Sequence, residues 1–251
     1  MAGEPITVVL TGAGGRMGRV VAPVLDQEPD IDLVAMVSSQ YPRRPAPGVP
    51  VRCSDLPEVL AIVSPRVVVD FSVPAHSLQV IAAAHAHGSV PVVGTTGFKA
   101  GELETIAAGC VRSGLPALVI PNFSLGATVL ARLAREAVRH LPALEIIECH
   151  HQGKRDAPSG TALRLAAILG EGRTAGIPVH SVRLPGMVAH HEIILGGRGE
   201  YLTLRHDSTS RECFIPGLLL AIRRARQCRG LVQDLDDLLR PGPGTGEGDG
   251  S

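Results

Sequence analysis

The sequence contains no tryptophan, few aromatic side chains and no excess of charge of either sign. Aromatic residues make up 2% of the 251 residues, and 24 basic side chains balance 24 acidic ones. A neutral balance removes the usual electrostatic reason for binding nucleic acid or an anionic membrane. We therefore expect no nucleic-acid partner and no membrane partner, and a small molecule is the expected ligand.

Long apolar runs and paired cysteines are also missing. No apolar stretch approaches the roughly 20 residues that span a bilayer, and the opening MAGEP lacks the basic region and cleavage site of a signal peptide. The five cysteines form no CxxC pair and no dense framework, which favours reduced thiols. These features predict a soluble, cytoplasmic protein.

Short apolar runs alternate with helical patterns over the first half of the chain. The expected strands cover residues 6–10, 31–37, 67–71, 90–93 and 117–120, and the expected helices begin near residue 18 and cover residues 55–62, 77–87 and 101–114. The apolar content of 45% allows one large domain or two modest ones. The alternation predicts an α/β fold with a Rossmann-like, doubly wound parallel sheet, whose ligand crevice lies beyond the carboxyl ends of the strands.

The pattern changes after residue 122. We expect helices over residues 125–140, 159–170, 217–226 and 231–239, and strands of a mixed or antiparallel sheet over residues 144–150, 181–184, 190–195, 200–206 and part of 210–214. The predicted domains are a dinucleotide-binding domain over residues 1–123, completed by C-terminal helices within 215–240, and an α+β substrate domain over residues 124–214. The composition of residues 241–251 is typical of a disordered tail.

A glycine-rich turn, GAGGRMG, joins the first expected strand to the first expected helix. Such a turn lets the backbone approach a phosphate without interference from Cβ atoms, while the helix offers its N-terminal amides to a pyrophosphate. The spacing that fits is GxxGxxG through Gly12, Gly15 and Gly18, since GxGxxG would place glycine at Met17. Glycine turns also serve packing, but the flanking strand and helix favour dinucleotide binding.

The residue after the second strand bears on the choice of cofactor. Many NAD-binding proteins carry an acid there for the ribose 2′-hydroxyl, whereas this sequence has Ser38. Without a carboxylate the site does not repel a 2′-phosphate, which Arg16 and the hydroxyls of Ser38 and Ser39 could bind. Arg43 and Arg44 could contribute, or could equally be solvated loop charges. We therefore expect NADPH to be preferred, with NADH as the alternative.

The segment ECHHQGKRDAPSGTAL, residues 148–163, combines several groups that suit an anionic substrate. They are two histidines, a lysine and the start of an expected helix, at His150, His151, Lys154, Gly160 and Thr161. Histidine is a tunable general acid near neutral pH, and lysine supplies a fixed charge or a proton. Helix N-terminal amides suit a carboxylate. This combination predicts a site that protonates an anionic substrate.

Each of these features also has a simpler interpretation. The histidines could merely close a strand, Lys154 could be a loop charge, and the Ser-Gly-Thr could only cap the helix. Their coincidence within a few residues, in a chain with a dinucleotide turn, favours catalysis.

A metal site is a further alternative. Zinc could in principle bind Cys149, His150 and His151, but neighbours in an extended chain point to opposite faces. We therefore expect no metal. Three other histidines are expected to be ordinary strand residues, although the first could lie near the site: His190, His191 and His206.

The chain resembles the dihydrodipicolinate reductase family over nearly its whole length, up to about residue 239. The motifs are GAGGRMG at 12–18, DFSVP at 70–74, GTTG at 94–97, PNFSLG at 121–126 and EIIECHHQGKRDAPSGTAL from 145, followed by VRLPGMVAHHEIILGG and LTLRHDSTSRECF. The HHxxKxDAPSGTA element is highly specific. The sequence departs from the family at Ser38, where several members carry an acid.

The resemblance implies an NAD(P)H-dependent reductase that converts 4-hydroxy-tetrahydrodipicolinate, a cyclic dicarboxylate, to tetrahydrodipicolinate in the diaminopimelate route to lysine. It implies that His150 is the proton donor and acceptor, that Lys154 is a second proton donor, and that His151, Gly160 and Thr161 bind the substrate carboxylates. The residues expected to line the cofactor are Gly12, Ala13, Gly14, Gly15, Arg16, Met17, Ser38, Gly94, Thr95, Thr96, Pro121, Asn122, Phe123 and Ser124. It also implies a homotetramer assembled through the second domain, which would thus serve oligomerisation as well as substrate binding.

Two other functions would also suit a chain with a dinucleotide turn, but features of the sequence disfavour both. Another two-domain nicotinamide oxidoreductase, acting on an aspartate-like amino acid, is disfavoured by the HHQGK loop and the SGT helix start. A catalytically inert dinucleotide sensor is disfavoured by His150 and Lys154, because a sensor has no need of a proton donor.

Overall fold

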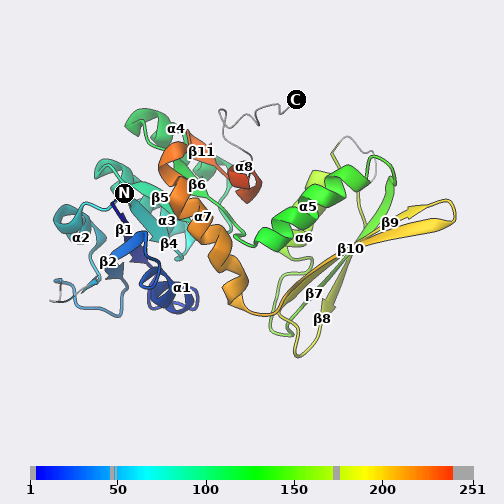
Figure 1. Ribbon diagram of the computed structural model, residues 1–251, viewed down its shortest axis with the longest axis horizontal. Helices are drawn as coiled ribbons and strands as arrows, with labels where there is room; N and C mark the ends of the chain where they lie inside the picture. Colours follow the sequence, from blue (N-terminus) through cyan, green and yellow to red (C-terminus); the bar gives the residue numbers. More distant parts are fainter. Residues whose placement is uncertain (1–3, 46–47, 49, 172–175, 240–251) are drawn as a thin grey trace, which may run out of the picture. The chain divides into compact units, whose positions relative to one another are not determined.

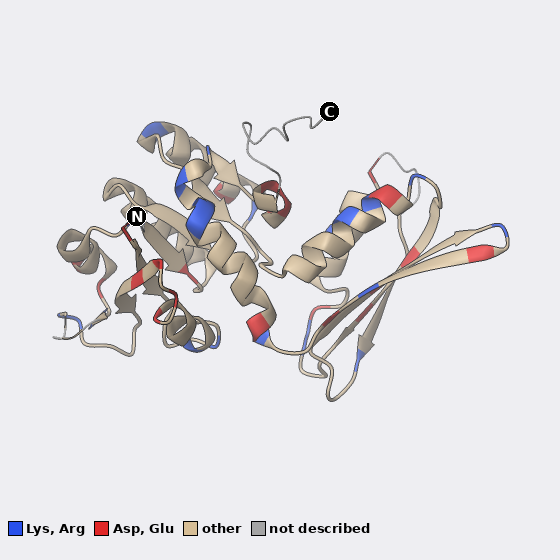
Figure 2. Ribbon diagram, viewed as in Figure 1, with Lys and Arg blue, Asp and Glu red and all other residues tan. Residues whose placement is uncertain are grey.

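The computed structural model describes residues 4–45, 48, 50–171 and 176–239. The chain forms two compact units: unit 1 comprises Met1–Phe123 and Ile215–Ser251, and unit 2 comprises Ser124–Phe214 (Figure 1). Unit 2 is therefore inserted into the sequence of unit 1. No helix in the described ranges is long and apolar enough to cross a membrane. Basic and acidic residues are interspersed in both units (Figure 2).

Unit 1 is built on a parallel sheet of seven strands in the order β11-β6-β5-β4-β1-β2-β3. The strands are β1 Ile6–Thr11, β2 Ile31–Val37, β3 Val51–Cys53, β4 Val67–Asp70, β5 Val90–Val93, β6 Ala117–Val119 and β11 Leu231–Val232. The helices are α1 Gly18–Leu25, α2 Leu56–Val63, α3 Pro74–Ala86, α4 Ala100–Ser113, α7 Ile215–Arg224 and α8 Leu235–Leu239, with the 3-10 turn η2 Ala225–Gln227. The strand order reverses beside β1, which defines a switch point.

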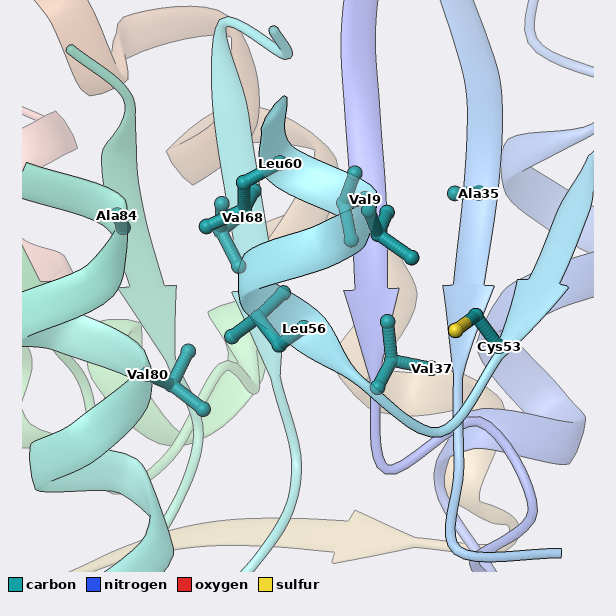
Figure 3. Close-up of a cluster of buried hydrophobic side chains, with 10 residues drawn as sticks. Val9, Ala35, Val37, Cys53, Leu56, Leu60, Val68, Val80 and Ala84 are labelled. Atoms are coloured by element: carbon teal, nitrogen blue, oxygen red, sulfur yellow. The ribbon is translucent and has the colours of Figure 1, made fainter. Parts of the chain in front are cut away.

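The valine-rich strands of unit 1 explain why its sheet is buried on both faces. The side chains of β4 and β5 are fully buried, as expected for parallel strands covered on both faces. In one cluster, Val9 and Val68 of the sheet pack with Leu60 of α2 and Val80 of α3 (Figure 3). The packed strands hold the loops at their carboxyl ends in place.

Unit 2 has a mixed sheet of four strands in the order β10-β9-β7-β8. The strands are β7 Ala143–His150, β8 Val179–Arg183, β9 Ala189–Gly197 and β10 Glu200–Ser208, and the helices are α5 Leu125–Ala137 and α6 Gly160–Leu169, with the 3-10 turn η1 Arg211–Phe214. Strand β7 pairs parallel with β8 and antiparallel with β9. Leu130 of α5 and Leu165 of α6 pack on Ile146 and Ile193, so the helices cover one face of the sheet.

The predicted fold class is confirmed, and the five strands expected in the first half lie within one residue of their predicted ends. Two predictions were wrong. Residues 211–214 form a 3-10 turn instead of a strand, because the Ser210 hydroxyl accepts from the Glu212 amide and turns the chain. Residues 231–232 form strand β11 on β6, and only residues 235–239 of that stretch are helical. The short edge strand β3 was not predicted, and the predicted tail lies outside the described residues.

Candidate active site

The glycine turn after β1 is packed too tightly for other residues. Gly12 has a φ of +71°, and a Cβ atom there would lie 2.6 Å from the carbonyl oxygen of Phe71. A Cβ at Gly18 would lie 2.4 Å from the Gly12 carbonyl oxygen. Helix α1 starts next to this turn with no side-chain cap and no acid in its first turn. Such a cradle fits the pyrophosphate of a dinucleotide.

Ser38 lies beside this turn, at the end of β2. It is 9% exposed, its Oγ accepts a hydrogen bond from the Gln40 amide, and a Cβ at Gly14 would lie 2.6 Å from that Oγ. Arg16 is exposed at the turn. Arg43, in contrast, lies 3.9 Å from the Asp55 carboxylate on the surface. The position expected to meet the adenosine ribose is thus adjacent to the glycine cradle.

Asp70 is the centre of a polar network at the carboxyl edge of the sheet. It is completely buried at the end of β4 and accepts hydrogen bonds from the hydroxyls of Thr11, Ser72, Ser77 and Thr95. The hydroxyl oxygens of Ser77 in α3 and of Thr95 lie 2.8 Å apart. The network ties the ends of β1 and β4 to α3 and to the GTTG segment. Sequence reasoning missed this role, although an acid at the end of a buried strand was a usable signal.

Phe71 contacts two of the other predicted cofactor residues of unit 1, Gly94 and Phe123. A Cβ at Gly94 would lie 2.2 Å from Cε1 of Phe71, so the GTTG segment passes directly over this ring. The rings of Phe71 and Phe123 meet edge to face with centroids 6.0 Å apart. The glycine turn, Ser38, the GTTG segment and Phe123 thus follow the carboxyl ends of the parallel strands, where open α/β sheets bind ligands. Ser124, the last of the predicted residues, begins unit 2.

In unit 2, a buried carboxylate organises the predicted catalytic segment. Glu148 is 0% exposed and contacts Nδ1 of His150. Arg183 of β8 binds both oxygens of Glu148, at 2.6 and 3.0 Å, and the Ser159 amide donates to Oε1. Burial alone would raise the pKa of Glu148, but hydrogen bonds from Arg183, Ser181 and His150 lower it to about 2. Glu148 is therefore ionised at neutral pH.

His150 lies beside a second buried histidine, His191, which was expected to be an ordinary strand residue. The rings of His150 and His191 meet edge to face with centroids 5.5 Å apart. Burial lowers the pKa of His150, and Glu148 partly offsets this effect. Burial, followed by the charge of His150, lowers the pKa of His191 to about 4, and neither ring nitrogen of His191 has a hydrogen-bond partner among the described residues. His191 is therefore neutral at pH 7.

Strand register explains why His191 lies here. Antiparallel pairing places it opposite Glu148 on one side and opposite His206 on the other, so the three side chains form a row across β7, β9 and β10. His190 points to the other face, where it pairs with Asp207 at 2.6 Å. His191 and His206 were expected to be ordinary strand residues, and the strand register places both on the sheet face that carries Glu148.

Two helices begin beside this row. Ser159 caps α6, and a Cβ added to Gly160 would meet no atom within 4 Å, so this helix start is open. Ser124 caps α5, and its Oγ lies 3.3 Å from Nε2 of His206. Helix N-termini favour carboxylates. The start of α6 donates an amide to Glu148 and the start of α5 lies beside His206, an arrangement that suits an anionic ligand.

The other predicted residues of the segment lie in the loop after β7. Lys154 is mostly buried and its Nζ lies 2.8 Å from the Asp156 carboxylate, while its amide donates to the His151 carbonyl. His151 itself is exposed. No group of three or more metal-binding side chains was found among the described residues, and Cys149 lies on the opposite face of β7 from His150.

A parallel sheet with a glycine cradle, linked to a unit with a buried acid, imidazole and cations, defines a pyridine-nucleotide-dependent oxidoreductase. Models of the N-terminus and the C-terminus of dihydrodipicolinate reductase match residues 6–123 and 126–239. The chain belongs to the dihydrodipicolinate reductase family.

Named relatives agree with this assignment. The 4-hydroxy-tetrahydrodipicolinate reductase of Symbiobacterium thermophilum is 46% identical over 95% of this chain and 99% of its own length, and that of Moorella thermoacetica is 44% identical over 93% and 98%. The solved structure of dipicolinate-bound dihydrodipicolinate reductase from Paenisporosarcina sp. TG-14 superposes with a TM-score of 0.84 at 31% identity, over 93% of this chain and 99% of that one.

Proposed function

We propose that this chain reduces 4-hydroxy-tetrahydrodipicolinate to tetrahydrodipicolinate with NAD(P)H, in the diaminopimelate route to lysine. The observation that carries the proposal is the buried contact of His150 with Glu148 beside the open start of α6. The names of the relatives support the activity, and the dipicolinate bound by the Paenisporosarcina enzyme supports a cyclic dicarboxylate substrate. The reaction adds one hydride and one proton to the ring, and its hydroxyl leaves as water.

The residues of unit 2 would supply the proton and hold the substrate. Nδ1 of His150 contacts Glu148, which leaves Nε2 as the atom that donates a proton. Gly160 and Thr161, at the start of α6, would bind one carboxylate, while His151 and Lys154 would contribute further contacts. Lys154 would also place positive charge near the ring as hydride addition makes it more negative, which favours the transition state over the ground state.

The residues of unit 1 would hold the cofactor. The reduced nicotinamide supplies the hydride. Residues 12–17 would cradle the pyrophosphate, the GTTG segment and residues 121–124 would line the nicotinamide half, and Ser38 would face the adenosine ribose. The tight approach of Gly12 and Gly18 to neighbouring backbone supports this fit. NADPH is the proposed preference, because Ser38 carries no charge to repel a 2′-phosphate.

We further propose a homotetramer in the cytoplasm, formed through the face of the unit 2 sheet that α5 and α6 leave uncovered. This face carries the exposed ring of Tyr201 and the half-buried side chains of Ile147 and Ile194. The five unpaired cysteines suit a reducing compartment. Sedimentation velocity of the purified protein tests the assembly, and a monomer at micromolar concentration would exclude it.

A coupled assay tests the activity. Dihydrodipicolinate synthase generates fresh substrate from pyruvate and aspartate semialdehyde, and oxidation of NADPH is followed by absorbance. We expect turnover that requires both the synthase and this protein. If neither NADPH nor NADH is oxidised, the proposed function is wrong.

A further inference from the structure

We propose that Glu148, held by Arg183, is the positioning residue of this site: it fixes the tautomer of His150 and the place of the α6 N-terminus together. The proposal rests on the proposed function, in which His150 donates the proton. In the proposed mechanism Glu148 contacts neither the substrate ring nor the cofactor, and it acts on the reaction through His150 and Ser159.

The contacts of Glu148 use both of its oxygens. Oε2 accepts hydrogen bonds from Nδ1 of His150 and Nη1 of Arg183. Oε1 accepts hydrogen bonds from Nη2 of Arg183 and from the amide of Ser159. A carboxylate has about four lone-pair sites, and these four bonds, with a further hydrogen bond from the Ser181 side chain, saturate them. Arg183 is anchored in turn by the carbonyl oxygens of Asp156 and Val182, both at 2.7 Å. The carboxylate is therefore fixed in position and in orientation.

The charge of Glu148 decides the tautomer of His150. A fully buried carboxylate with no partner would take up a proton, but bidentate pairing with arginine stabilises the ionised form. An ionised carboxylate only accepts hydrogen bonds. Nδ1 of His150 must therefore carry a hydrogen in both charge states of the ring, and Nε2 is the nitrogen that gains and loses the proton.

The same carboxylate sets where a substrate would bind. The Ser159 amide, which donates to Oε1, belongs to the N-cap residue of α6, directly before Gly160 and Thr161. A substrate carboxylate held by these amides is thus placed relative to His150 through one side chain. Small errors in such placement are costly, because proton transfer needs hydrogen-bond distance.

A matched control lies on the same strand. Glu145 also pairs with a histidine, since its Oε2 lies 2.7 Å from Nε2 of His180, but both side chains are more than half exposed and the described structure shows neither an arginine nor a helix amide on this carboxylate. Glu145→Gln therefore removes the same chemical group without touching the buried cluster.

Steady-state kinetics of Glu148→Gln and Glu145→Gln form the first test. We expect Glu148→Gln to lower kcat by roughly 10- to 100-fold, as for residues that orient metal-bound histidines. The Kd for NADPH should stay within about twofold, because every proposed cofactor residue except Ser124 belongs to unit 1. The charged and titratable groups around His150 are Glu148, Lys154, Arg183 and His191. Loss of the Glu148 charge should shift the pH at which kcat declines to lower values. Glu145 shares a sheet face with Ile194, so sedimentation velocity checks that Glu145→Gln keeps the wild-type assembly. This variant should keep wild-type kcat and pH profile.

A spectroscopic test does not depend on turnover or on the folding of Glu148→Gln. In wild-type protein labelled with ¹⁵N-histidine, with His150→Gln used to assign the signal, we expect neutral His150 to carry its hydrogen on Nδ1. An Nε2–H tautomer in the wild type, or kinetics of Glu148→Gln equal to those of Glu145→Gln, would overturn the proposal. If the wild-type protein itself shows no turnover, the proposed function fails, and the tautomer still decides the role of Glu148.

Discussion

Replacement of Gly12 by alanine would add two energetic costs that glycine avoids at this position. The first is conformational, because Gly12 has a φ of +71°, and an L-residue pays about 1–2 kcal/mol in the left-handed region. The second is steric, because the new Cβ would lie 2.6 Å from the Phe71 carbonyl oxygen, and overpacking of this kind costs about 1–3 kcal/mol. Gly12→Ala should therefore destabilise unit 1 by about 2–5 kcal/mol.

Gly114→Ala isolates the conformational cost. Gly114 has a φ of +68°, and a Cβ there would meet no atom within 4 Å. This variant should lose only about 1–2 kcal/mol. Urea unfolding followed by circular dichroism suits a protein without tryptophan, and calorimetric titration with NADPH gives the cofactor affinity. Only Gly12→Ala should weaken NADPH binding. Equal destabilisation by the two variants would refute the close approach of the turn to Phe71.

Three further predictions address cofactor binding and pH. Asp70→Asn should lower the affinity for NADPH about tenfold without unfolding unit 1, because the four hydroxyls that donate to Asp70 lose a charged acceptor; titration calorimetry and circular dichroism decide this, and unchanged affinity contradicts it. Ser38→Glu should shift the kcat/KM ratio towards NADH about tenfold by repelling a 2′-phosphate, whereas the uncharged Ser38→Gln should not; equal ratios for the two variants would place cofactor specificity elsewhere. The pKa of His191 in the folded protein is about 4, below the ordinary 6.5, so the stability that neutral His191 contributes is present above pH 6.5 and is lost as pH falls towards 4. Urea titrations of His191→Phe should show a smaller loss of stability over this pH range than the wild type. The same pH dependence in both proteins would contradict the lowered pKa of His191.

Local pattern was sufficient to predict five of the seven strands of the unit 1 sheet. Residues 31–37 and 90–93 are mostly apolar, rich in Ile and Val, and of strand length, so their burial follows from their own composition. Strand β11 has only two residues and exists because its backbone pairs with Ala117 and Leu118, more than a hundred residues earlier. No periodicity can reveal a pairing of that kind.

The candidate site also has a part that local sequence predicts and a part that depends on strand pairing. His150, Lys154 and the start of α6 are close in sequence, and their chemistry can be read from one segment. Arg183 reaches Glu148 only because β8 pairs parallel with β7, and His191 faces His150 only in the observed antiparallel register. A register shift of one residue would bring His190 to that face instead. Sequence alone does not set that register.

The insertion of unit 2 within unit 1 has a consequence for biosynthesis. A ribosome finishes the segment that ends at Phe214 before it makes α7, β11 and α8, and domains tend to fold as they emerge. The nascent chain can therefore assemble the histidine-bearing unit in full while the nucleotide-type sheet still lacks its outer strand. Until Leu231 and Val232 have been translated, the edge of β6 stays without the neighbour that it has in the finished protein.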